Sequence, residues 1–400
     1  MKKTLYTLTL IVGLALSILA SAQNGSAQEI VAARQNEFSL NLFKQLAASD
    51  NGNVFISPLS ISMACGMLAD GASGETQDEI WKALGMENVS NEEATLYLKN
   101  ILQQVSHSDA ITKICMANAV WVDKGYQIKK SYAGDMQSYF QAKVQHLELS
   151  NGSSAKTINN WSQQQTNGLI KQICNPSIFN DSLRLMLTNA IYFKAMWDKP
   201  FIKNFTDERA FFVTQFQIVM AEMMMQKRHV PYAAIDNLQM VRLFYRGNDY
   251  CMDILLPNKD VSMEKTIDSL SFEKLAELTA KLNSDNEVEM WIPKFTTMYH
   301  RQLNSDLRAL GMEKMFGSSA DLSGISKDSL YVSSVQHVSF IKVDEEGTEA
   351  AASSRIIVSG YGRPKEPIYF HVDRPFLFFI REKTRGTILF AGKIVNPTIQ

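Results

Sequence analysis

The 400-residue sequence lacks the residue patterns that carry most enzyme chemistry. It has no Gly-x-Ser-x-Gly nucleophile motif, no His-Glu-x-x-His zinc motif and no glycine-rich loop that would hold a phosphate. Its six histidines show no spacing typical of metal ligands; they are His107, His146, His229, His300, His337 and His371. We therefore expect that the protein is not an enzyme and has no cofactor and no metal site.

The sequence also has a small net charge and few cysteines. The formal net charge is −1 and the lysines and arginines are scattered, so we expect no binding to nucleic acid. The four cysteines are widely and irregularly spaced, without a Cys-x-x-Cys pair; they are Cys65, Cys115, Cys174 and Cys251. The apolar sequence around three of them favours buried free thiols over disulfides.

Long hydrophobic runs are absent after the N-terminus. Residues 1–3 are basic at two positions, residues 5–20 are apolar, and Ala20-Ser21-Ala22 offers small residues for cleavage. This pattern predicts a secretory signal peptide over residues 1–22, because the run is short for the alternative, an uncleaved membrane anchor. We therefore expect a secreted protein, extracellular or periplasmic, without a membrane span. No linker or repeat divides residues 23–400, which predicts a single domain.

What the sequence does contain is an unusual segment between Val343 and Pro375. Its residues alternate in kind from position 348 to 360, and no proline interrupts them. The even positions are small or apolar: Thr348, Ala350, Ala352, Ser354, Ile356, Val358 and Gly360. A period of two indicates a half-buried strand, whereas Gly347 before it and Gly360-Tyr361-Gly362-Arg363-Pro364 after it are typical of loops. The segment can therefore be either an exposed loop or an inserted strand.

Other stretches predict the surrounding elements. Ser57 can cap a helix that begins at Pro58, and the residues through Ala69 are too apolar to lie on a surface. The sequence predicts buried strands over residues 114–122 and 185–194. Residues 331–343 are expected to form a helix and then a strand, and residues 370–380 and 386–394 two apolar strands of a second sheet.

These motifs together resemble the serpin family, in particular inhibitory serpins, and the likeness extends over nearly the whole mature chain. Glu345-Glu346-Gly347-Thr348-Glu349 with the alanines that follow is similar to the hinge of a serpin reactive-centre loop, and Asn53 to Ile61 is similar to the start of the family's buried helix. The resemblance implies an α+β serpin fold. It would have three β-sheets, the largest being the central sheet A, about eight or nine helices and an exposed reactive-centre loop over about residues 345–367.

The resemblance also implies roles for individual residues. The hinge comprises Glu345, Gly347, Thr348, Glu349, Ala350, Ala351 and Ala352. A polar cluster, the shutter, lies where the sheet opens and comprises Ser57, Ser60, Asn189 and His337. Trp197 is expected beneath the point where the loop enters the sheet, and His337 is equally compatible with an ordinary buried histidine.

The reactive bond is placed by two counts in the family's geometry. Tyr361 lies fourteen residues after Gly347 and fourteen before Pro375, so the predicted bond is Tyr361–Gly362. A tyrosine there suits a chymotrypsin-like or cathepsin G-like serine protease, or a papain-like cysteine protease. Val358, for an elastase-like protease, and Arg355, for a trypsin-like one, remain alternatives.

The resemblance implies a suicide-substrate mechanism with the target protease as partner in a covalent 1:1 complex. Residues 348–360 would stay outside the sheet until cleavage and then insert, trapping the acyl-enzyme. The alternative is a non-inhibitory serpin, a carrier or chaperone, but such proteins have bulkier hinges. We expect a monomer without a heparin site, because Lys99 is the only cation of the helix over residues 91–105.

Overall fold

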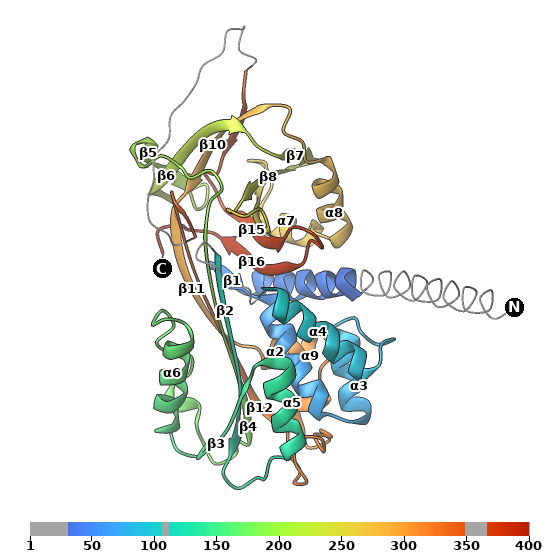
Figure 1. The fold of residues 1–400 in the computed structure, drawn as a ribbon. Coiled ribbons are helices and arrows are strands. Elements are labelled where there is room, and N and C mark those ends of the chain that lie inside the picture. Colours follow the sequence, from blue (N-terminus) through green and yellow to red (C-terminus); the bar gives the residue numbers. More distant parts are fainter. Residues whose placement is uncertain (1–30, 106–111, 349–365, 400) are drawn as a thin grey trace, which may run out of the picture.

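The computed structural model describes residues 31–105, 112–348 and 366–399, whose strands form three β-sheets (Figure 1). The central sheet has six strands in the order β11-β12-β13-β4-β2-β3. Its long strands run side by side through the lower half of the molecule, with α6 on one face and the larger group of helices on the other. The strands are β2 (Thr112–Asp123), β3 (Lys143–Leu147), β4 (Leu185–Met196), β11 (Phe295–Gln302), β12 (Val332–Asp344) and β13 (Gly347–Thr348).

The two smaller sheets lie in the upper half of Figure 1, with α7 and α8 beside them and the other helices below. One of these two sheets also has six strands. Their order is β1 (Val54–Ile56), β16 (Ile388–Ile394), β15 (Phe376–Glu382), β9 (Tyr250–Pro257), β8 (Leu238–Phe244) and β7 (Tyr232–Ile235). The four-stranded one has the order β14 (Ile368–His371), β10 (Glu287–Pro293), β6 (Ile218–His229) and β5 (Thr206–Phe212).

Counting only the described residues, nine α-helices accompany these sheets, one of them over residues 31–49. The others are α2 (Pro58–Gly71), α3 (Gly74–Ala83), α4 (Asn91–Val105), α5 (Lys130–Phe140), α6 (Ser154–Gln165), α7 (Met263–Ser269), α8 (Phe272–Lys281) and α9 (Asn304–Ala309). This α+β arrangement confirms the predicted fold class. Over the same described ranges, no helix combines the length and the apolar character that crossing a bilayer requires.

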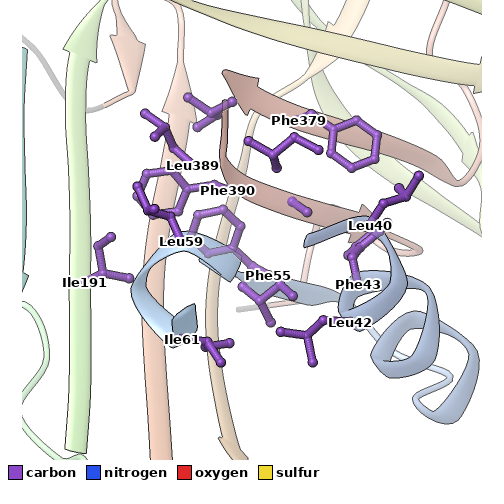
Figure 2. Packing of buried hydrophobic residues seen from close by; sticks show 14 of the residues in the cluster. Leu40, Leu42, Phe43, Phe55, Leu59, Ile61, Ile191, Phe379, Leu389 and Phe390 are labelled. Atoms are coloured by element: carbon purple, nitrogen blue, oxygen red, sulfur yellow. The ribbon is translucent and has the colours of Figure 1, made fainter. Parts of the chain in front are cut away.

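Helix α2 is the central helix of the core. Ser57 caps it by accepting a hydrogen bond from the Ser60 N–H, and Pro58 occupies its first turn. Every residue of α2 except Asp70 is buried, because sheets and helices surround it. Figure 2 shows Leu59 and Ile61 among side chains from the 31–49 helix, β1, β4, β15 and β16. Helix α2 therefore lies in a close-packed apolar layer that includes a residue of the central strand β4.

Two expectations about strands were wrong. Residues 332–344 form one continuous strand, β12, without the helix predicted at its start. Its central residues are buried on both faces, so the alternation that identifies a half-buried strand is missing. Residues 370–380 divide between two sheets, since Phe370 and His371 belong to β14 and the apolar run from Phe376 belongs to β15.

The four cysteines are free thiols, as predicted, but the expected burial was wrong for Cys115, which is only partly buried. Burial raises the pKa of the thiols of Cys65, Cys174 and Cys251 to about 12. They therefore act as small apolar side chains rather than as nucleophiles.

Candidate functional site

The shortest strand of the central sheet, β13, separates β12 from β4 at one end. Thr348 pairs with Val343 of β12 and with Ala195 of β4, and the pairing is antiparallel on both sides. Farther along, β12 and β4 pair directly and in parallel, from Phe340–Tyr192 to Val332–Leu185. At one end of the central sheet, the two residues of β13 therefore separate β12 from β4. Beyond β13 these two strands pair directly.

Thr348 is held in this opening by aromatic residues from other elements. Its side chain is completely buried, and its hydroxyl lies 2.9 Å from the Tyr245 hydroxyl. The Tyr245 ring stacks on Trp197 with centroids 4.5 Å apart, and the Trp197 indole N–H donates to the Asp344 carbonyl at 3.0 Å. Trp197 thus lies at the point where the hinge enters the sheet. The expectation that Thr348 stays outside until cleavage was wrong, because this pocket already encloses its side chain.

Gly347 is required by the same close approach. Its φ is +150°, and a Cβ built there would overlap the carbonyl oxygen of Ala195 and lie 2.7 Å from the Met196 Cα. Any other residue would push β13 away from β4.

The acidic turn before Gly347 is held by lysines from other parts of the chain. Glu345 accepts a hydrogen bond from the Thr206 hydroxyl at 2.8 Å and lies 3.4 Å from the Lys294 ammonium, and Glu346 lies 2.7 Å from that of Lys203. Burial alone would raise the pKa of Glu345, but its own backbone N–H, Thr206 and Lys294 together lower it. The carboxylate therefore stays ionised and ties the turn to the four-stranded sheet.

The shutter residues come together below the hinge. His337 Nδ1 lies 2.8 Å from Asn189 Oδ1, and its Nε2 accepts from the Ser57 N–H at 3.3 Å. Nδ1 must therefore carry the proton and donate to Asn189. Asn189 in turn donates to the Ser60 carbonyl at 3.2 Å and to Asn118 Oδ1 at 2.6 Å. These bonds join β12 and β4 to α2 and β2 beneath the closed part of the sheet.

Sequence reasoning missed several contributors. Tyr245, Thr206 and Lys203 belong to no local pattern, since they meet the hinge only through tertiary packing. Likewise, the pairing of Lys294 with Glu345 had no signal in the sequence. The hydrogen bond between Asn118 and Asn189 had no signal in the sequence either.

Several of the predicted site residues lie outside the described residues. They are Glu349, Ala350, Ala351, Ala352, Arg355, Val358, Tyr361 and Gly362. The signal peptide at residues 1–22 lies outside them as well. Among the residues that the structure does describe, no group of three or more metal-ligating side chains comes together.

His337 makes stability depend on pH. Burial lowers its pKa to about 3, with a smaller contribution from His300. The neutral ring is favoured in the folded state, so its stabilisation is complete above the unfolded pKa of about 6.5 and is lost as pH falls from there towards 3. We expect the free energy of unfolding to decrease by up to about 1.4 kcal/mol per pH unit in this range because of His337.

This prediction is checked by urea unfolding at several pH values. His337→Gln keeps one donor and one acceptor but does not titrate, so its pH profile should be flatter than that of the wild type. Equal slopes for the two proteins would show that His337 does not control the acid response.

The largest sheet thus contains, at one end, a two-residue strand that enters between β12 and β4 directly after an acidic turn. The family model described as serpin (serine protease inhibitor) matches residues 33–397. Iripin-2 of Ixodes ricinus is 34% identical over 365 residues, covering 90% of this chain and 91% of that protein.

Two solved structures are similar to the whole fold. The thermophilic serpin tengpin in its native state has a TM-score of 0.84 and 29% identity, covering 91% of this chain and 94% of that one. A complex of human thyroxine-binding globulin has a TM-score of 0.86 and 25% identity, covering 93% and 100%. The chain belongs to the serpin family, a family of protease inhibitors rather than enzymes.

Proposed function

We propose that this serpin inhibits its target protease as a suicide substrate. The protease cleaves Tyr361–Gly362 and remains bound to Tyr361 as an acyl-enzyme in a covalent 1:1 complex. The freed segment then inserts between β12 and β4. The observation that carries the proposal is β13, because two hinge residues already occupy the first positions of the strand that insertion would complete.

An inserted segment that kept the register of β13 would continue both of its pairings. Ala350 would then lie between Ile341 and Phe193, and Ala352 between Ser339 and Ile191. The β12 and β4 residues at these positions are buried. The even-numbered residues of the segment would then face the core, which is where their small or apolar side chains fit.

The same register brings Ser354 between His337 and Asn189. Insertion would therefore have to break the bond between these two side chains. This supports a shutter role for His337, since its contact with Asn189 holds the sheet closed beyond the hinge.

The proposed specificity is tested at Tyr361. Incubation with chymotrypsin should give an SDS-resistant complex, and the released C-terminal peptide should begin at Gly362. Tyr361→Arg should lose the complex with chymotrypsin and gain one with trypsin. Release of a peptide that begins after Val358 or Arg355 would assign the reactive bond to those positions instead, in keeping with an elastase-like or trypsin-like target.

The second candidate is a non-inhibitory carrier, favoured by the similarity to a thyroxine-binding globulin complex. The sequence of the hinge supports inhibition instead, because Ala350, Ala351 and Ala352 can enter a sheet at little steric cost. We further propose that the chain is secreted after removal of residues 1–22 and acts as a monomer without heparin. If the protein formed no covalent complex with a protease of any specificity class, the result would favour the carrier.

A further inference from the structure

A cavity of about 750 Å³ is lined by residues from both smaller sheets and from the 31–49 helix and α7, and none of them belongs to the hinge or the shutter. Its walls come from the end of the 31–49 helix, the turn between β5 and β6, the segment from β9 into α7, and the residues flanking β15 and β16. Its lining is mostly apolar and includes Val213, Pro257, Val261, Ile267, Pro375 and Val395. This size and lining are typical of sites for small amphiphilic molecules.

Lys393 of β16 also lines this cavity, and its side chain is almost wholly buried, with 3% of the residue exposed. Its ammonium donates to the Ala47 carbonyl at 2.6 Å and to the Asp50 carbonyl. Both acceptors are neutral, and they use two of the three N–H donors. Within the described part of the chain, no carboxylate forms an ion pair with Lys393.

Four carboxylates line the same cavity, those of Asp50, Glu264, Asp268 and Asp373, and none of them forms an ion pair with Lys393. Asp373 lies 2.5 Å from Arg374 and 3.4 Å from Lys259, so two cations at the cavity wall already neutralise it. Asp50 accepts from the Gly52 N–H at 2.9 Å. The backbone N–H of Glu264 and the Ser262 hydroxyl, at the start of α7, lower the pKa of the Glu264 carboxyl. Lys393 is therefore left as a buried cation that has hydrogen bonds but no contacting anion.

Burial lowers the pKa of Lys393, and the charges of Asp50 and Glu264 offset only part of that effect. A ligand anion in direct contact with the ammonium would stabilise its charged form further. We propose that this cavity binds an amphiphilic carboxylate, such as a fatty acid or an aryl-alkyl acid. The carboxylate accepts the remaining N–H of Lys393, and the apolar body packs against Val261, Ile267 and Val395. The site is independent of protease inhibition, because none of these residues belongs to the hinge, the shutter or the reactive bond.

The test uses a fluorescent fatty acid, 11-(dansylamino)undecanoic acid, with its methyl ester as the uncharged match. The wild-type protein should bind the acid at least about tenfold more tightly than the ester, the amount expected for one charge-assisted hydrogen bond. In Lys393→Met the two probes should bind equally. Lys327→Met, which removes a lysine outside the cavity, should behave as the wild type.

Lys393 also binds the end of the 31–49 helix, so Lys393→Met can lose stability. Val261→Trp provides a second variant, because it adds bulk to the cavity wall at a residue that accepts no hydrogen bond from the Lys393 ammonium. It should weaken both probes, while thermal unfolding followed by circular dichroism reports whether each variant is folded. Equal binding of acid and ester by the wild type would overturn the role of Lys393. Unchanged binding by Val261→Trp would overturn the location, and absence of binding by either probe would overturn the site.

Discussion

Replacing Thr348 with arginine is expected to convert the inhibitor into a substrate. The Thr348 side chain is completely buried and lies against the Tyr245 hydroxyl. Burying an unpaired guanidinium there would cost roughly several kcal/mol. The variant chain should therefore be cleaved at the reactive bond with loss of the SDS-resistant complex. Gel analysis of the products at increasing ratios of inhibitor to protease measures the change.

The structure adds a result that must precede any cleavage. Because Thr348 already lies in the central sheet, arginine at this position should expel β13 from that sheet in the uncleaved protein. The Trp197–Tyr245 stack would then be uncovered. The tryptophan emission should shift to longer wavelength before protease is added. Thr348→Ser keeps the hydroxyl that meets Tyr245 and should match the wild type in both assays. A stable complex formed by Thr348→Arg would refute insertion as the trapping step.

Cleavage of the reactive bond is expected to make the chain much more resistant to heat. A fully inserted segment would form a new antiparallel ladder on each side, with β12 and with β4, in place of the single direct ladder between them. Each added hydrogen bond contributes about 1 kcal/mol, and the buried even-numbered side chains add apolar area. Thermal unfolding of the intact and the cleaved protein, followed by circular dichroism, tests this.

The control is Thr348→Arg cleaved at the same bond. It contains the same nick but should not complete the strand, so its unfolding temperature should remain near that of the intact chain. If cleaved wild type unfolded at the same temperature as intact wild type, the segment would not be a strand held outside its sheet.

The sequence alone was sufficient for the elements whose signals are local. Ser57 and Pro58 mark the start of α2, and the apolar run of residues 185–194 marks β4. The likeness to serpins gave the fold class and pointed to His337, Asn189 and Ser57, which the structure brings into contact.

The position of Thr348 could not be read from the sequence. Whether the hinge lies inside or outside the sheet depends on a pocket made by Tyr245 and Trp197, which are far from it in the chain. The strand β12 was misread for a related reason. Its residues are covered on both sides by elements distant in sequence, so burial does not alternate along it.

The two residues of β13 also have a kinetic consequence. Pairing of a new strand with a sheet is slowest at its first contacts, because chain entropy is lost there before enough hydrogen bonds have formed to compensate. If the segment inserts as we propose, these first contacts are already made before cleavage, and only the later positions remain to be added. Ser354 would then meet the His337–Asn189 hydrogen bond six positions beyond Thr348, and breaking that bond would limit the rate of insertion relative to hydrolysis of the acyl-enzyme.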